Sequence, residues 1–295
     1  MAHKKLRGLG VAMVTPFKQD GSIDQEATKR LVEHLITKGT DFLVVQGTTG
    51  ETPTLSPQER QEHLRLVVET NGGRLPIVLG KSSNNTAALV HELETMDYSG
   101  VDYILSAVPS YNKPTPKGMY QHFKAVAKAS QRPIILYNVP GRTGANMPAE
   151  TTSRLAYKYD NIVGIKEASG NLEQIGHILA NRPKDFLVFS GDDAIALSCI
   201  SMGADGVISV IGNAATQQFS DMAHAALSND CQKAAQIHQQ LFLLYGLLFK
   251  EGNPAGIKCV LNALGICENR LRLPLVPVSE ELEHKIRGMV EYLIK

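Results

Sequence analysis

Short apolar segments alternate with longer amphipathic segments between residues 8 and 225 of this chain. A short apolar run without polar alternation is typical of a strand that is buried on both faces, as in a parallel sheet. The pattern predicts the following strands: Val11–Val14, Phe42–Val45, Ile77–Leu79, Tyr103–Leu105, Ile134–Tyr137, Ile162–Ile165, Leu187–Phe189 and Val207–Val210.

A helix is predicted after each strand, and several helices carry start signals. Ser56-Pro57-Gln58-Glu59 combines an N-cap serine, a proline at the first helical position and a glutamate at the third. The other helices are expected to begin near Asp24, Thr86, Pro116, Pro148, Asn171, Asp192 and Asn213. Repeated strand–helix units indicate an α/β protein that closes into a (β/α)8 TIM barrel. A doubly wound open sheet is the alternative, but the glycine-rich phosphate turn that usually follows its first strand is not found here.

The C-terminal part of the chain differs, because only helical segments follow residue 230. These segments are Asp230–Phe249, Asn253–Leu264 and Ser279–Ile294, and the turn-rich link from Glu268 to Pro277 precedes the last of them. We therefore predict two units, a barrel over residues 1–225 and a helical appendage over residues 226–295 that packs on it.

Composition narrows the class of protein without identifying it. Apolar residues make up 43% of the chain, and its formal net charge of +1 creates no field that would attract nucleic acid or an anionic membrane. The longest apolar run, Leu241 to Phe249, is far shorter than the roughly 20 residues that cross a bilayer. The basic N-terminus followed by Gly8–Val14 resembles a signal peptide, but Pro16 ends the apolar stretch without a cleavage site, so we expect a first strand.

The cysteines also bear on the cellular compartment. Cys199, Cys231, Cys259 and Cys267 show no CxxC spacing and lie in apolar or helical stretches. We expect reduced core thiols in a cytoplasmic protein.

Lys166 is the most informative residue for function. It follows the apolar run Ile162–Ile165, so the pattern places an amine at the tip of a buried strand. Burial disfavours the charged form of an amine, and a neutral amine is the nucleophile that forms Schiff bases with carbonyl substrates. The competing interpretation is that Lys166 has already left the strand and extends to water.

Other groups suited to carbonyl chemistry follow neighbouring strands. The segment Gly47-Thr48-Thr49-Gly50-Glu51 offers backbone N–H groups and two hydroxyls to a carboxylate, although an ordinary glycine turn would contain the same residues. Tyr111 and Tyr137 can shuttle protons or simply line the rim of the barrel. Arg142, in a Gly/Pro turn, can bind a second carboxylate or remain a solvated loop charge. Catalytic groups of such barrels lie at the carboxyl ends of the strands, so we expect these residues to converge with Lys166.

Metal and cofactor sites are not expected. Asp192 and Asp193 follow the seventh strand and could hold a metal, but at the start of a helix we interpret them as caps. The histidines show no HExxH or similar zinc spacing.

From Gly8 to Leu293 the chain closely resembles the pyruvate-dependent class I aldolase family, which includes dihydrodipicolinate synthase and N-acetylneuraminate lyase. The resemblance lies in Val14-Thr15-Pro16-Phe17, Gly47-Thr48-Thr49-Gly50-Glu51, Tyr137-Asn138-Val139-Pro140, Gly164-Ile165-Lys166-Glu167, Ser190-Gly191-Asp192-Asp193 and Gly206-Val207-Ile208-Ser209. It implies condensation of pyruvate with L-aspartate 4-semialdehyde to 4-hydroxy-tetrahydrodipicolinate, the first committed step of diaminopimelate and lysine biosynthesis. It further implies a cytoplasmic homotetramer, a dimer of dimers, without metal or organic cofactor.

The resemblance also implies how pyruvate is held. Lys166 forms the Schiff base, and the backbone at Thr48 and Thr49 binds the pyruvate carboxylate. Gly191 and Ile208 contribute backbone carbonyls near the lysine.

Proton transfer and the second substrate are assigned on the same ground. Tyr137 transfers protons, and the Thr48 hydroxyl links it to Tyr111, which in this family reaches over from a neighbouring subunit. Arg142 is similar to the arginine of the synthase branch, which holds the carboxylate of aspartate semialdehyde and which the lyase branch lacks.

The chain departs from the pattern of the lysine-inhibited bacterial members. Ser110 stands where they have a tyrosine, Pro57 and Arg60 where they have histidines, and Ala88 where they have a glutamate. These changes remove partners for a bound lysine, so we predict weak or absent lysine inhibition. The loss of an aromatic residue at position 110 also predicts a tetramer that is looser or differently arranged.

Four other functions remain as alternatives. A sialate lyase or other sugar-acid aldolase would keep the Schiff base, but neutral polyols need hydroxyl partners rather than the cation of Arg142. A pyridoxal-phosphate enzyme would need a phosphate cradle, and Gly80-Lys81-Ser82 lacks the Walker glycine because position 75 is Leu75. A zinc enzyme lacks ligand spacing, and a non-catalytic keto-acid sensor would not need the full set of reactive residues.

Overall fold

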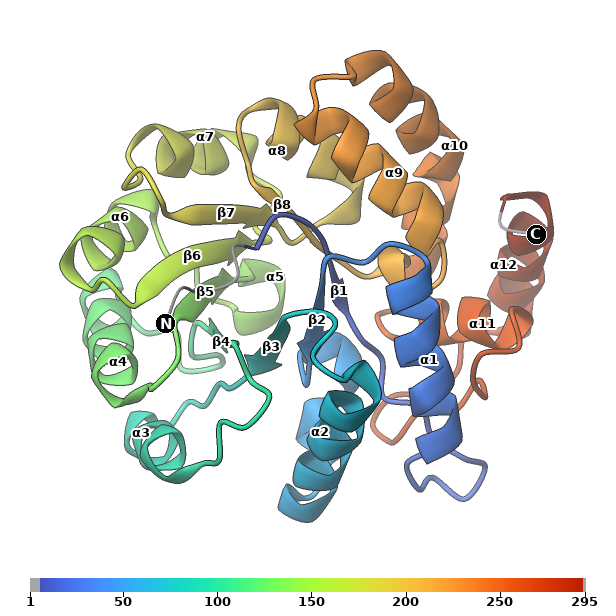
Figure 1. Cartoon of the computed structure of the whole chain (residues 1–295), viewed down its shortest axis with the longest axis horizontal. Coiled ribbons are helices and arrows are strands. Elements are labelled where there is room, and N and C mark those ends of the chain that lie inside the picture. Colours follow the sequence, from blue (N-terminus) through green and yellow to red (C-terminus); the bar gives the residue numbers. More distant parts are fainter. Residues whose placement is uncertain (1–5, 294–295) are drawn as a thin grey trace.

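The computed structural model describes residues 6–293, and its centre is a closed barrel of parallel strands that follow one another in sequence order (Figure 1). The strands are β1 Gly8–Ala12, β2 Phe42–Val45, β3 Ile77–Gly80, β4 Tyr103–Ala107, β5 Ile134–Asn138, β6 Ile162–Glu167, β7 Leu187–Ser190 and β8 Gly206–Ser209. The TIM-barrel fold predicted from the sequence is therefore confirmed, and the open doubly wound sheet is excluded.

Helices surround the barrel, as Figure 1 shows. They are α1 Gln25–Thr37, α2 Pro57–Asn71, α3 Thr86–Thr95, α4 Pro116–Ala129, α5 Pro140–Thr143, α6 Ala149–Lys158, α7 Leu172–Ala180, α8 Ala196–Ser201, α9 Thr216–Leu227, α10 Cys231–Phe249, α11 Ala255–Ala263 and α12 Glu280–Leu293. Short 3₁₀ helices, η1 Thr48–Gly50, η2 Thr52–Thr54, η3 Asp193–Ile195 and η4 Ile211–Asn213, follow β2, β7 and β8. The capping box predicted at Ser56 and Glu59 is present at the start of α2.

Some predicted element boundaries are wrong, and the helix expected near Asp192 begins as the 3₁₀ helix η3, with α8 following only at Ala196. The first strand was expected at Val11–Val14 but ends at Ala12, because the N–H of Val14 donates to the Asn213 side chain instead of a strand. The helix expected near Asn213 begins only at Thr216, since the 3₁₀ helix η4 comes first.

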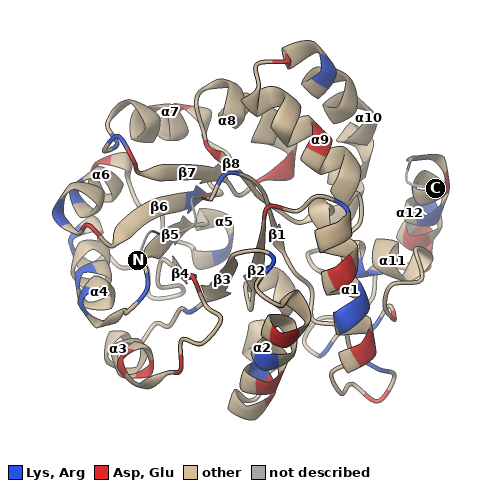
Figure 2. Ribbon diagram, viewed as in Figure 1, with Lys and Arg blue, Asp and Glu red and all other residues tan. Residues whose placement is uncertain are grey.

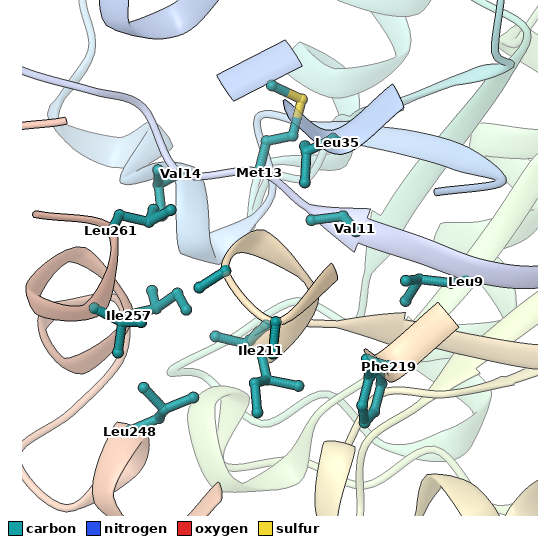
Figure 3. Close-up of a cluster of buried hydrophobic side chains, with 14 of the residues drawn as sticks. Leu9, Val11, Met13, Val14, Leu35, Ile211, Phe219, Leu248, Ile257 and Leu261 are labelled. Carbon is teal, nitrogen blue, oxygen red and sulfur yellow. The ribbon is translucent and has the colours of Figure 1, made fainter. Parts of the chain in front are cut away.

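The C-terminal helices pack on the barrel and share its apolar core. One buried cluster joins Val14 and Ile211 of the barrel region to Leu248 of α10 and to Ile257 and Leu261 of α11 (Figure 3). Helix α10 also packs along α9, and α12 contacts α10 and α11. The predicted helical segments are present, but Ile294, the last residue of the third, lies outside the described residues. The division into two domains near residue 225 stays a prediction.

The outer helices carry charged residues of both signs (Figure 2). Lys, Arg, Asp and Glu are interspersed on outer helices such as α1 and α2 (Figure 2). Among residues 6–293, no helix is long and apolar enough to span a bilayer. Residues Met1–Lys5 of the possible signal sequence lie outside the described part, and Gly8–Ala12 forms the expected strand.

All four cysteines are free thiols, but Cys231 is exposed at the start of α10, so the prediction of a core thiol is wrong there.

Candidate active site

Lys166 belongs to β6 and is buried, with 5% of its surface exposed. Within residues 6–293 its amine forms no salt bridge, and it lies 4.6 Å from the centre of the Tyr137 ring. The register of the barrel explains this contact, because Tyr137 of β5 is the direct partner of Lys166 in the ladder. The interpretation in which Lys166 leaves the strand and extends to water is therefore wrong.

A cavity of about 380 Å³ opens over Lys166 at the carboxyl ends of the strands. Its walls bring together residues that are far apart in sequence: Thr48 and Thr49 after β2, Tyr137, Arg142 in α5, Lys166, Gly191 and Asp192 after β7, and Asn253 before α11. The predicted convergence of most of the candidate residues at one end of the barrel is thus observed.

The two threonines occupy the 3₁₀ turn η1, between β2 and α2. Thr49 is buried, and its hydroxyl accepts a hydrogen bond of 3.0 Å from the side-chain amide of Asn253, whereas Thr48 is exposed. The backbone leaves the strand through Gln46 and closes the turn at Glu51, and both residues adopt left-handed φ angles of 58° and 51°. Such angles are costly for residues with a side chain and cluster at functional sites, where the surrounding structure enforces them.

Arg142 is exposed in the short helix α5 and lines both this cavity and a neighbouring one of about 500 Å³. In the described part of the chain, its guanidinium has no hydrogen bond or salt bridge. A free guanidinium at the cavity wall is well suited to bind a carboxylate through two parallel hydrogen bonds, in a bidentate geometry.

Two predicted site residues do not line the cavity in this single chain. Tyr111 is 90% exposed after β4 and lines neither cavity, and its left-handed φ of 72° is held by a hydrogen bond from its N–H to the Thr143 carbonyl. Ile208 is fully buried in β8, and Val210 lines the cavity instead. No hydrogen bond joins the hydroxyls of Thr48 and Tyr137 in the part of the molecule that is described.

Both aspartates after β7 were expected to cap the helix that they open, and this is wrong for Asp193. The Asp192 carboxylate accepts the N–H of Ala194 and so caps η3, as predicted. The Asp193 carboxylate accepts the N–H groups of Val210 and Ile211, and burial raises its pKa to about 6. Across residues 6–293, no three His, Cys, Asp or Glu side chains are grouped so as to hold a metal ion.

Sequence reasoning missed the residues that surround the site. Glu167, next to Lys166, is buried and accepts hydrogen bonds from the side chains of Asn138 and Gln174, while burial raises its pKa. Lys258 in α11 forms a buried salt bridge with Glu51. A lysine in the apolar helical run from Ile257 to Leu261 was the sequence signal that could have identified it.

This arrangement has the parts that Schiff-base chemistry needs. A buried amine without an acidic partner can attack a carbonyl carbon, and a phenol beside it can carry protons. Thr48 and Thr49 line the same cavity, and the backbone N–H groups and hydroxyls of such a turn can bind a carboxylate.

Comparison with known proteins agrees with this chemistry. Residues 5–293 match the model of the dihydrodipicolinate synthetase family. The 4-hydroxy-tetrahydrodipicolinate synthase of Phocaeicola vulgatus is 52% identical over 293 residues, which cover 99% of each chain.

Solved structures give the same result. The dihydrodipicolinate synthase of Thermotoga maritima is 38% identical with a TM-score of 0.95, over 98% of this chain and 99% of that one. The chloride-inhibited dihydrodipicolinate synthase of Acinetobacter baumannii, solved in complex with pyruvate, is 37% identical with a TM-score of 0.95, over 98% of this chain and 100% of that one. With a family model that matches nearly its whole length, the chain belongs to the dihydrodipicolinate synthetase family.

Proposed function

We propose that this protein is a 4-hydroxy-tetrahydrodipicolinate synthase, which condenses pyruvate with L-aspartate 4-semialdehyde through a Schiff base on Lys166. The observation that carries the proposal is the position of Lys166: its amine is buried, has no acidic partner among residues 6–293, and faces one cavity with the threonine turn and Arg142. The name of the Phocaeicola vulgatus relative supports the same product, and the Acinetobacter baumannii synthase was solved in complex with pyruvate.

The reaction begins when the amine of Lys166 attacks the keto carbon of pyruvate. Water leaves, and the resulting iminium acts as an electron sink, so that the pyruvate methyl group can lose a proton and form an enamine. The enamine carbon attacks the aldehyde carbon of the second substrate, whose oxygen takes up a proton. Attack of the substrate's own amino group on the iminium carbon closes the ring and releases Lys166.

The cavity groups, and Ile208 beside them, have roles in this sequence. The turn at Thr48 and Thr49 binds the pyruvate carboxylate, and Arg142 binds the carboxylate of the semialdehyde. Tyr137, whose ring lies beside the amine, carries protons to and from the reacting atoms. Gly191 and Ile208 contribute backbone carbonyls near the amine. Lysine supplies the electrophilic activation, so the reaction needs no metal or organic cofactor.

The active form is a homo-oligomer, and we favour a tetramer built as a dimer of dimers. The support is Tyr111, which is exposed outside the cavity of its own chain while its backbone is held in a left-handed conformation. In the assembly, Tyr111 enters the site of a neighbouring subunit, where the Thr48 hydroxyl links it to Tyr137. The free thiols fit an enzyme of the cytoplasm.

A coupled assay tests the proposal: pyruvate, aspartate semialdehyde and a dihydrodipicolinate reductase, with the loss of NADPH as the signal. We expect turnover that is abolished by Lys166→Ala and retained by the matched surface variant Lys29→Ala. If turnover is absent but borohydride still traps pyruvate on Lys166, the second substrate is a sugar aldehyde instead of aspartate semialdehyde. Absent turnover without trapping would favour a non-catalytic protein.

A further inference from the structure

The C-terminal segment contacts the threonine turn at two residues, Thr49 in its middle and Glu51 at its end. Asn253 donates its side-chain N–H to the Thr49 hydroxyl at 3.0 Å. Lys258 of α11 and the backbone N–H of Arg272 both donate to the carboxylate of Glu51, the latter at 3.0 Å. The region that follows the barrel therefore contacts the threonine turn, which we assign to binding of the substrate carboxylate.

The contact between Lys258 and Glu51 is a salt bridge with both side chains fully buried. The Lys258 ammonium also donates to the Arg270 carbonyl at 2.8 Å and lies 4.2 Å from the centre of the Phe17 ring. Removal of one partner of such a pair leaves an unpaired buried charge, which is strongly unfavourable. The pair thus fixes the Glu51 side chain in one position.

The position of the Glu51 side chain matters because of the Glu51 backbone. This residue has a left-handed φ of 51°, and its N–H closes the 3₁₀ turn by donating to the Thr48 carbonyl. A residue with a side chain keeps this conformation only where its surroundings enforce it. The buried contacts of the carboxylate supply that constraint, so they hold the conformation of a turn whose threonines line the cavity.

Asn253 acts on the other threonine of the turn. A hydroxyl has one proton to donate and lone pairs to accept. Because the Thr49 oxygen accepts from Asn253, its own proton is left for another acceptor, and both residues line the cavity over Lys166. A substrate carboxylate is the acceptor that such a donor suits best.

We propose that Asn253 and Lys258 are positioning residues, which set the threonine turn for binding of the pyruvate carboxylate. This inference rests on the proposed function and adds two residues from outside the barrel to its substrate site. The C-terminal segment is then part of the pyruvate site as well as a packing element.

The test measures pyruvate binding and stability separately, in the full-length protein. Three variants are compared with wild type: Asn253→Ala, Lys258→Met and the double variant Glu51→Gln/Lys258→Met. The exposed pair of Lys285 and Glu281 in α12 offers the matched control Lys285→Met. Binding is measured as the pyruvate concentration at half-maximal borohydride trapping and as the KM values of both substrates. Stability is measured as the midpoint of thermal unfolding.

We expect Asn253→Ala and the double variant to fold and to require about tenfold more pyruvate for half-maximal trapping, because small displacements of binding groups are costly. The KM of the second substrate should stay unchanged. The double variant is decisive, since it contains no unpaired buried charge and should regain the stability that Lys258→Met loses, without regaining pyruvate affinity.

Wild-type pyruvate affinity in Asn253→Ala and in the double variant would overturn the inference, as would recovery of affinity together with stability in the double variant. Failure of Lys258→Met to fold leaves these two variants to decide. Absence of pyruvate trapping in the wild-type protein would instead overturn the proposed function on which the inference rests.

Discussion

Gly191 lies so close to Lys166 that a side chain at position 191 would crowd the lysine chain. A Cβ atom at position 191 would be 3.0 Å from Cε and 3.1 Å from Cγ of the lysine, and 2.6 Å from Cβ of Ala168. The absence of a side chain at 191 is therefore what allows the lysine chain to extend from β6 past β7 toward the cavity.

The variant Gly191→Ala should displace the Lys166 amine and lower kcat by up to about 100-fold, the cost of a displacement of about 1 Å. The measurement is the coupled assay together with thermal unfolding. Gly288→Ala is the matched control, since position 288 lies in α12 with open space around it. Wild-type activity of Gly191→Ala would contradict the proposed constraint on Lys166.

Tyr137→Phe should keep the ring beside the Lys166 amine but remove the group that carries protons. We expect kcat to fall by about 10²- to 10⁴-fold, the usual contribution of general acid–base catalysis. Borohydride trapping of pyruvate at equilibrium should still occur. Unchanged kcat in this variant would assign proton transfer to another residue.

Arg142→Ala should weaken binding of the second substrate alone. Loss of charge-assisted hydrogen bonds to a carboxylate predicts a KM for aspartate semialdehyde that is about 10- to 100-fold higher, with the KM of pyruvate unchanged. Arg142→Lys keeps the charge without the planar fork, so its KM for aspartate semialdehyde should lie between those of wild type and Arg142→Ala. Equal increases in both KM values would show that Arg142 does not discriminate between the substrates.

Lysine should inhibit the enzyme weakly or not at all. Arg60 and Ser110 line the neighbouring cavity, but Ala88 is exposed in α3 and lacks a carboxylate, and Pro57 offers no donor at the start of α2. A bound lysine would therefore lack the partner that a carboxylate at position 88 would offer to its ammonium groups. A titration with lysine at fixed substrate concentrations should leave the rate unchanged, and strong inhibition would refute this prediction.

The stability of the protein should fall as the pH is lowered from 6.5 to 4. His63 is buried without a hydrogen-bond partner among the described residues, and burial lowers its pKa from 6.5 to about 4. The unfolded chain binds the proton first, so the contribution of neutral His63 is complete above pH 6.5 and is lost as pH falls toward 4.

This loss amounts to about 1.4 kcal/mol per pH unit for one histidine. Denaturant unfolding across this pH range should show that His63→Leu loses less stability than wild type. His91→Leu, on the exposed side of α3, serves as the control. Identical profiles for His63→Leu and wild type would contradict the assignment.

The sequence pattern predicted the barrel because strand and helix signals alternate along the chain and are local. Boundaries failed where backbone groups bind side chains from distant segments, as at Val14 and Asn213. Lys166 was recognisable because it interrupts an apolar strand.

The role of Lys258 and Asn253 could not be predicted in the same way. Their partners, Glu51 and Thr49, are more than 200 residues away in sequence, and only the packing of α11 against the barrel brings them together. Tyr111 is a different case, since its predicted partner belongs to another subunit.

Lys166 carries pyruvate as a Schiff base in the reaction that we propose. Treatment of the enzyme with pyruvate and borohydride, followed by proteolysis and mass spectrometry of the peptides, tests it most directly. We expect one reduced pyruvate adduct per chain, located on Lys166 and absent without pyruvate. An adduct on another lysine such as Lys81 at the neighbouring cavity, or no adduct at all, would contradict it.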